Sequence, residues 1–169
     1  MAERTQVDIV RLTPDDWPVY CDLRVAGLTQ DAFAFGSTLE RENQLGEADL
    51  RARLQRRAMF AARVGDQYLG LVGGQTADEQ GTADLLSMWV EPQARRAGVG
   101  GALVRAVIDW AREQGFHQVK LWFTEGNEPA ERLYLRHGFK LTGERQHIRP
   151  NDPDHWELEM VCELRGVRR

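Results

Sequence analysis

The chain contains few of the residues that mark disulfide-stabilised or membrane-spanning proteins. Its 169 residues include two cysteines, Cys21 and Cys162, which are too few for a disulfide framework. Each cysteine lies in an apolar pattern, so we expect core thiols in a reducing cytoplasm. No stretch approaches the roughly 20 apolar residues of a membrane span, and the N-terminal MAERTQVDIVRL lacks the apolar run of a signal peptide.

Lysine is also scarce, and the net charge is negative. The formal net charge is −4 at pH 7, and Lys120 and Lys140 are the only lysines among the basic residues. Duplex nucleic-acid binders normally carry a basic face, so this balance argues against that class of protein. We therefore expect neither a nucleic acid nor a membrane as partner.

The residues that are present suit one folded domain. With 42% hydrophobic and 28% charged residues, a chain of this length can bury a sizeable core. No internal repeat and no low-complexity linker divides it. We therefore expect a single domain over residues 1–169.

Apolar periodicity predicts the order of the secondary-structure elements. Alternating runs predict strands near residues 7–12, 59–64, 68–76, 83–90, 119–124, 139–146 and 155–164. Helical patterns predict a helix capped by Asp15 or Asp16 that ends near Ala26, a second that ends near Arg57, a long one ending at Gly115, and a short one over 127–138.

This order combines hairpins with one or two parallel crossovers. It predicts an α/β protein of the α+β type, with a mixed, mostly antiparallel sheet of about seven strands and about four helices. Gly73 and Gly74 interrupt the third predicted strand and mark a candidate β-bulge.

Five residues before the long helix form an unusual cluster: Arg95, Arg96, Gly98, Gly100 and Gly101. Glycine costs about 1 kcal/mol against alanine in a helix, so the cluster indicates that a bare backbone is needed there. Backbone N–H groups at a helix N-terminus bind anions, and arginine adds bidentate contacts to phosphate oxygens. The cluster predicts a phosphate site, and a glycine-rich turn with solvated arginines is the alternative.

Three phosphate-binding motifs compete for this cluster. A P-loop is excluded because no lysine followed by serine or threonine comes after the glycines. A dinucleotide fingerprint would need glycine where Leu103 stands and would follow its strand directly, although Glu125 matches its ribose-binding acid. The pattern Arg95-x-x-Gly98-x-Gly100 fits the third motif, the Gln/Arg-x-x-Gly-x-Gly/Ala signature of the GNAT superfamily of acyl-CoA acetyltransferases.

The resemblance to GNAT acetyltransferases covers about Met59–Glu144. MFAARVGDQYLGLVGG resembles a hairpin of that family, and LLSMWVEPQARRAGVGGALVRAVIDWA resembles its strand–loop–helix. LWFTEGNEPAERLYLRHGFKLTGE resembles its later strand–helix–strand, with the landmarks Asn127, Ala130, Tyr134, Gly138 and Phe139.

The resemblance implies the acyl-CoA N-acyltransferase fold, with the strand ending at Val90 splayed from the strand starting at Val119. Acetyl-CoA would be the co-substrate, its pyrophosphate on the glycine loop and its pantetheine arm paired with the backbone near Met88. An N–H group there would stabilise the developing oxyanion. The residues implied to bind the cofactor are Met88, Trp89, Val90, Arg95, Arg96, Ala97, Gly98, Val99, Gly100, Gly101, Asn127, Ala130 and Tyr134.

Three residues are candidates for proton transfer. Tyr134 resembles the family's tyrosine aimed at the thiol, and a phenol with a pKa near 10 can protonate a departing thiolate. Core packing is the alternative role for this side chain. Asp84 lies eleven residues before Arg95, where some family members carry a catalytic glutamate, and is the first candidate base. Glu91 is the second, with a solvated or structural role as the alternative for both carboxylates.

The acceptor is expected to be an amine of a small molecule or of a protein, and the mild negative charge favours a cationic one. Its walls would come from residues 31–38 and from the turn at 149–156, with Phe33, Phe35 and Trp89 as apolar lining or as core. The four histidines, His117, His137, His147 and His155, show no metal-ligand spacing, so no metal is expected.

Two further expectations concern assembly and function. The last strand has the character of an exposed edge, which would allow pairing in a homodimer. The alternative function is a non-catalytic acyl-CoA-binding or sensing module, which would keep the cofactor loop without the chemistry.

Overall fold

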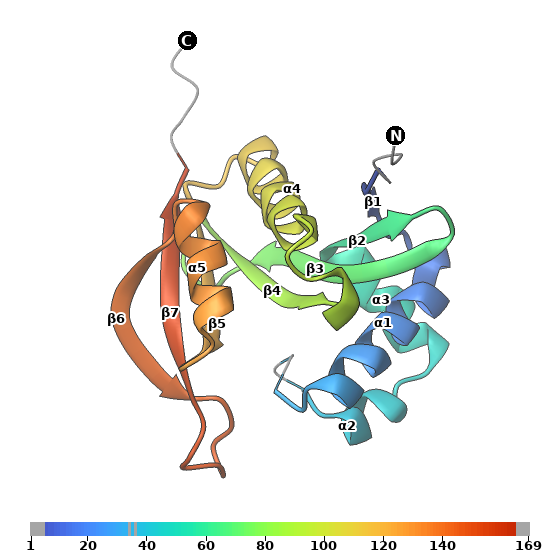
Figure 1. Cartoon of the computed structure of the whole chain (residues 1–169), viewed down its shortest axis with the longest axis horizontal. Coiled ribbons are helices and arrows are strands. Elements are labelled where there is room, and N and C mark those ends of the chain that lie inside the picture. Colours follow the sequence, from blue (N-terminus) through green and yellow to red (C-terminus); the bar gives the residue numbers. More distant parts are fainter. Residues whose placement is uncertain (1–5, 34, 36, 165–169) are drawn as a thin grey trace.

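The computed structural model describes residues 6–33, 35 and 37–164, which form one sheet of seven strands with five α-helices (Figure 1). The strands are β1 (Asp8–Arg11), β2 (Ala58–Val64), β3 (Gln67–Thr76), β4 (Thr82–Val90), β5 (Gln118–Thr124), β6 (Lys140–His147) and β7 (Trp156–Glu163). The helices are α1 (Trp17–Gln30), α2 (Leu39–Asn43), α3 (Glu47–Arg56), α4 (Val99–Glu113) and α5 (Glu128–Arg136), with 3-10 turns η1 (Pro14–Asp16) and η2 (Pro92–Ala94). The predicted mixed sheet of about seven strands is confirmed.

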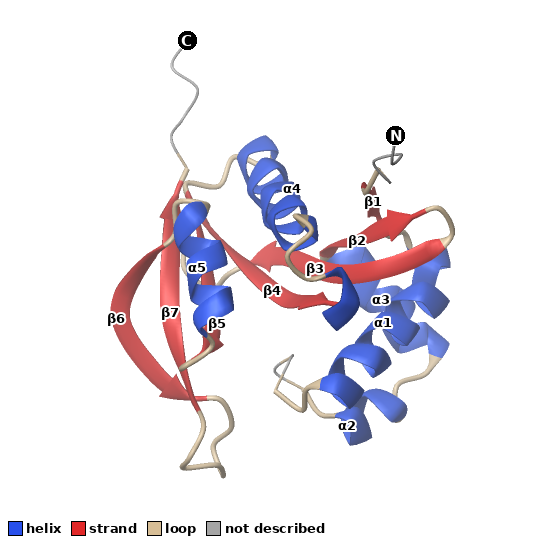
Figure 2. Cartoon of the chain, viewed as in Figure 1, coloured by secondary structure: helices blue, strands red, loops and turns tan. Residues whose placement is uncertain are grey.

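The sheet splays open between β4 and β5. Its strand order is β1-β2-β3-β4-β5-β7-β6, and β4–β5 is the one parallel pair within the described residues. That pair consists of three positions and ends at Asp84↔Lys120, although β4 continues to Val90 and β5 to Thr124. Figure 2 shows the two strands running apart beyond this point, as predicted.

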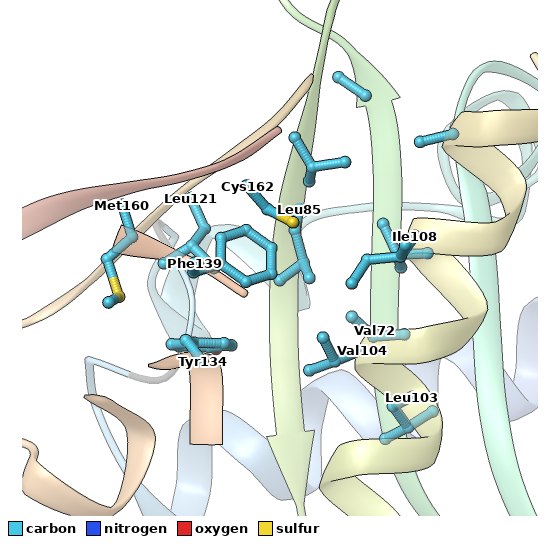
Figure 3. Close-up of a cluster of buried hydrophobic side chains, with 14 of the residues drawn as sticks. Val72, Leu85, Leu103, Val104, Ile108, Leu121, Tyr134, Phe139, Met160 and Cys162 are labelled. Carbon is cyan, nitrogen blue, oxygen red and sulfur yellow. The ribbon is translucent and has the colours of Figure 1, made fainter. Parts of the chain in front are cut away.

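Helices cover the two faces of the sheet unequally. In Figure 1, α4 and α5 lie on one side of the sheet, while α1 and α2 lie below β3 and β4 and α3 lies behind β3. Two apolar clusters correspond to these layers. The cluster beneath α4 and α5 includes Leu85, Leu103, Leu121 and Phe139 (Figure 3), whereas Tyr20, Phe35, Leu71 and Trp89 belong to the cluster beneath α1. Cys162 is buried in the first cluster, as the sequence predicts.

A β-bulge interrupts β4. Gly73 pairs with Leu86 and Leu71 pairs with Trp89, so Ser87 and Met88 together oppose Val72 of β3. The extra residue reverses the alternation of side chains, because Leu85 packs beneath α4 whereas Trp89, four residues on, packs beneath α1. The sequence placed the candidate bulge at Gly73 and Gly74; the register shift adjoins Gly73, but the inserted residue lies in the facing strand.

The helical region before β2 differs from the prediction. Pro18 lies in the first turn of α1 with Asp16 at the N-cap, as expected, but α1 continues to Gln30 because Gly27 and Leu28 are still buried. The second predicted helix is two helices, since the Thr38 side chain caps α2 and Gly46 starts α3. Within the described residues no helix is both long and apolar enough to cross a membrane.

The prediction that the last strand is an edge strand is wrong. β7 lies between β5 and β6 and pairs with both, so β6 forms this edge of the sheet. The reason is tertiary: β7 runs antiparallel to β5 over seven paired positions, an arrangement that local sequence does not specify. Any pairing between two copies at this edge would therefore involve β6.

Candidate functional site

The N-terminus of α4 presents free backbone donors. The first hydrogen bond of this helix runs from Ala102 N to Gly98 O at 3.1 Å. Among the described residues, the N–H groups of Val99, Gly100 and Gly101 therefore have no backbone acceptor, as is usual at a helix start. Three aligned donors with the positive end of the helix dipole form a site suited to an anion.

Two arginines stand beside these donors. Arg95 and Arg96 are both exposed, and neither forms an ion pair with a residue that the structure describes. Arg95 is tethered because its Nε donates to the Val90 carbonyl at 3.0 Å, which leaves its terminal nitrogens available. The donors and charges present here fit a phosphate or pyrophosphate group.

The three glycines of the motif have different roles. Gly98 has a φ of +82°, which favours glycine, and a Cβ at this position would meet nothing within 4 Å. A Cβ on Gly100 would lie 3.1 Å from Leu133, and one on Gly101 would lie 3.2 Å from the His137 ring. The sequence interpretation assigned all three to the anion, whereas Gly100 and Gly101 also allow α5 to approach α4 closely.

Helix α5 carries the next two candidate residues. Asn127 caps the helix, because its Oδ1 accepts a hydrogen bond from Ala130 N at 3.2 Å. This contact commits the amide oxygen but leaves Nδ2 of the exposed Asn127 as a donor. The cap therefore orients Asn127 without using the group that would contact a cofactor arm.

Tyr134 projects from α5 into the apolar cluster near Phe139, Leu121 and Met160 (Figure 3). Its ring packs against Phe123 and Phe139, with centroid separations of 6.3 and 5.8 Å. Its hydroxyl makes no hydrogen bond to a residue that the structure describes. Burial raises the pKa of Tyr134 well above its ordinary value, so the phenol stays protonated at neutral pH.

The splayed part of β4 contributes backbone groups. Beyond Asp84 this strand has no pairing partner on its β5 side among the described residues. Met88 and Val90 pack partly against the cluster beneath α4, so their backbone lies at the opening between β4 and β5. The Trp89 side chain points to the other face, where its buried Nε1 has no partner among the described residues. Trp89 therefore contributes its backbone alone to this opening.

The two candidate bases lie at opposite ends of β4. Asp84 is at the last β4–β5 pair, where burial raises the pKa of its carboxyl and the Lys120 ammonium opposes part of that rise. Phe123, which packs on Tyr134, is three residues beyond Lys120, so Asp84 lies about 10 Å along the strands from the Tyr134 level. A proton from an amine at that level would reach Asp84 through water.

Glu91 follows the other end of β4. Its side chain lines a cavity of about 240 Å³ beneath α1, together with Asp22, Tyr68 and Trp89. This cavity is on the face away from α4 and α5. Ala83 and Leu85 pack beneath α4, so Asp84 between them points to the same face as the cavity, and the two candidate bases are separated by the length of β4.

Two loops that are distant in sequence meet on the α1 side of the opening. Phe33 stacks on His155 with ring centroids 4.1 Å apart, and Arg149 lies over Phe33 at 4.8 Å. Arg149 Nη2 also donates to the Ala32 carbonyl at 2.7 Å. The sequence predicted that these loops form the acceptor wall, but it did not single out Arg149, which carries no local signal.

Comparison with known proteins agrees with this geometry. The family model described as "Acetyltransferase (GNAT) family" matches residues 23–139. The chain belongs to the GNAT acetyltransferase family. This membership removes the dinucleotide-binding alternative for the glycine motif.

Individual GNAT proteins resemble the chain over different lengths. N-acetyltransferase 8F1 of Rattus norvegicus is 33% identical over 92 residues, covering 52% of this chain and 42% of that protein. A GNAT-family acetyltransferase from Streptococcus pneumoniae superposes with a TM-score of 0.77 at 20% identity, covering 95% of this chain and 100% of that one. The PaiA N-acetyltransferase of Thermoplasma acidophilum, solved in complex with coenzyme A, gives 0.68 at 13% identity, covering 94% and 99%. The chain spans less than half the length of the first curated relatives it matches, and the solved structures establish the GNAT fold alone.

Proposed function

We propose that this protein transfers the acetyl group of acetyl-CoA to an amine, by direct attack of the amine within a ternary complex. The observation that carries the proposal is the row of N–H groups at Val99, Gly100 and Gly101, which have no backbone acceptor among the described residues and lie beside Arg95 at the open edge of β4. These donors suit a pyrophosphate, and the gap between β4 and β5 suits the arm attached to it.

The residues that would hold acetyl-CoA come from three elements. The start of α4 with Arg95 and Arg96 would bind the pyrophosphate, the backbone near Met88 and Val90 would pair with the pantetheine arm, and Asn127 Nδ2 would donate to it. When bound, acetyl-CoA supplies an activated thioester. The coenzyme A complex of the Thermoplasma acidophilum relative supports a coenzyme A site in this fold.

Two groups of this chain would act on the reacting atoms. A backbone N–H at Met88–Val90 would stabilise the negative charge that develops on the carbonyl oxygen, since a preorganised donor costs no reorganisation. The protonated Tyr134 hydroxyl would donate its proton to the departing thiolate. The Tyr134 hydroxyl has no hydrogen-bond partner in the part of the chain that the structure describes, which supports this role over simple packing.

Asp84 would accept the proton of the amine through water. Neutralising an amine of pKa about 10.4 at pH 7 costs roughly 4.6 kcal/mol, so a lysine-like acceptor gains much from a base. For an α-amine of pKa near 8 the cost is about 1.4 kcal/mol, and the gain is small. The raised pKa of Asp84 suits a base, whereas Glu91 follows the other end of β4.

The test mixes purified protein and acetyl-CoA with each amine of a panel and measures the release of the coenzyme A thiol. The panel contains polyamines, amino acids and peptides with a free N-terminus or lysine. We expect protein-dependent release with at least one amine and its loss in Tyr134→Phe. Calorimetric binding of coenzyme A without release for any amine would favour the sensing module, and no binding at all would refute the cofactor site.

A further inference from the structure

Ser87 holds an unusual backbone conformation at the centre of the opening. Its φ is +56°, in the left-handed region that residues with a Cβ rarely adopt. Ser87 is one of the two β4 residues of the bulge, three positions beyond the last pair with β5. The sequence offers no glycine here to make the conformation easy, so other contacts must hold it.

The conformation of Ser87 determines the direction of the next N–H group. The peptide between Ser87 and Met88 rotates with the Ser87 backbone, and its N–H belongs to Met88. A bulge redirects groups in this way because it breaks the regular alternation of a strand. The Met88 N–H is among the donors assigned above to the thioester oxygen.

Arg24 of α1 contacts the bulge from the face of the sheet that lies away from α4 and α5. Its Nη1 donates to Ser87 Oγ at 2.9 Å. Its other nitrogens, Nε and Nη2, form a bidentate pair with Glu42 of α2, both at 2.9 Å. The Arg24 side chain is 4% exposed, so this guanidinium is removed from solvent.

The Arg24 guanidinium is fixed by its surroundings. Arg53 of α3 donates to both oxygens of Glu42 at 3.1 Å, which holds the carboxylate that orients Arg24. The Phe35 ring lies 4.5 Å from the Arg24 guanidinium carbon. Three helices thus hold one nitrogen of Arg24 against Ser87.

We propose that Arg24 is a positioning residue for acetyl transfer: by holding Ser87 in its left-handed conformation, it points the Met88 N–H at the thioester oxygen. The inference rests on the proposed function. Arg24 itself touches no reacting atom, because its side chain lies between α1 and the sheet and acts through Ser87. A packing role alone would stabilise the fold without distinguishing an acylated cofactor from a free one.

The test compares affinities for acetyl-CoA and for coenzyme A, because the acetyl carbonyl is present in the first ligand alone. Ser87→Ala removes the Oγ contact and leaves the Arg24–Glu42 pair intact. We expect acetyl-CoA to bind about fivefold more weakly, the loss of about one hydrogen bond, with coenzyme A affinity unchanged in calorimetry. Ser87→Gly should recover part of the loss, since glycine tolerates the left-handed region.

Two further variants connect the effect to Arg24. Arg24→Lys keeps the positive charge beside Glu42 but loses the bidentate guanidinium geometry, so it should weaken acetyl-CoA binding and leave coenzyme A binding unchanged. Combined with Ser87→Ala, it should cause no further loss of acetyl-CoA affinity. Arg51→Lys, in an exposed ion pair of α3, is the control and should change neither affinity. If Arg24→Lys does not fold, the serine variants still decide the question.

Equal losses for both ligands in Ser87→Ala, or no loss for either, would overturn the positioning role. Failure of the wild-type protein to bind coenzyme A or acetyl-CoA would instead refute the proposed function. The two failures are distinguishable because the wild-type titrations come first.

Discussion

Replacing Tyr134 with phenylalanine should separate catalysis from stability. The substitution removes one hydroxyl that makes no hydrogen bond to a described residue, so no buried partner is left unpaired. The contacts of the ring with Phe123 and Phe139 remain. We therefore expect the melting temperature of Tyr134→Phe to stay within about 3 °C of the wild type, which corresponds to less than about 1 kcal/mol.

The rate of acetyl transfer should respond very differently. General acid catalysis contributes 10²–10⁴-fold, so kcat should fall by at least about 100-fold, or about 2.7 kcal/mol at 1.36 kcal/mol per tenfold. Affinity for acetyl-CoA should change little, because the hydroxyl acts on the departing sulfur. The assay is steady-state thiol release with the best amine from the panel, together with calorimetry for acetyl-CoA.

The pH profile adds a second criterion. Because burial raises the pKa of Tyr134 above its ordinary 10.0, the wild-type phenol should remain an acid through pH 10 without losing activity to its own ionisation. Wild-type kcat in Tyr134→Phe across this range would make Tyr134 a packing residue. A melting temperature lowered by 10 °C or more, with unchanged kcat, would do the same.

Three other predictions follow from named contacts. Asp84→Asn should lower the rate most near pH 7, and for an amine of high pKa the rate should recover at alkaline pH; a uniform rate loss would make Asp84 structural. Because burial raises the pKa of Asp84, its charge destabilises the fold at pH 7, so the variant should melt no lower than the wild type. Arg95→Ala and Arg96→Ala should each weaken coenzyme A binding about tenfold with reduced salt dependence, whereas Arg105→Ala, at an exposed position within α4, should not; equal effects of all three would contradict the phosphate site. Glu42→Ala should lower the free energy of unfolding by about 3–5 kcal/mol and the melting temperature by about 10 °C, because the buried Arg24 loses its ion-pair partner. Asp15→Ala, at an exposed ion pair, should lower the free energy of unfolding by under about 1 kcal/mol. Burial raises the pKa of Glu42, but hydrogen bonds and charges from Arg24 and Arg53 outweigh it, so the pKa is lowered. The stability difference between wild type and Glu42→Ala should therefore be full above pH 4.5 and shrink as the pH falls through the lowered pKa of Glu42. A stability difference independent of pH would contradict the ion pair.

Features that depend on residues close in sequence could be predicted from the sequence. The 3.6-residue period of α4 predicts one apolar stripe of Leu103, Val107, Trp110 and Ala111. Trp110 packs partly buried against the cluster in which the other three are fully buried. The glycine motif also marked Gly98 as a position where the backbone is special, and its left-handed φ of +82° is one that glycine tolerates. These features depend on neighbours within a few positions, so the sequence displays them.

Features that join distant segments had no such signal. Arg24 and Glu42 are 18 residues apart, and neither stands in a pattern that distinguishes it from a solvated charge. The bulge falls on Ser87, which has no special backbone tolerance and is held by Arg24 from another layer. The order β5-β7-β6 and the contact of Arg149 with Phe33 likewise arise from tertiary packing.

The proposal of direct transfer is tested most directly by following an isotopically labelled acetyl group. The protein is mixed in excess with labelled acetyl-CoA, with and without the best amine from the panel, quenched at short times and analysed by mass spectrometry. Direct transfer predicts label on the amine when amine is present, and no label on the protein at any time. Labelled protein that forms without amine and then passes its label to added amine would contradict attack within a ternary complex.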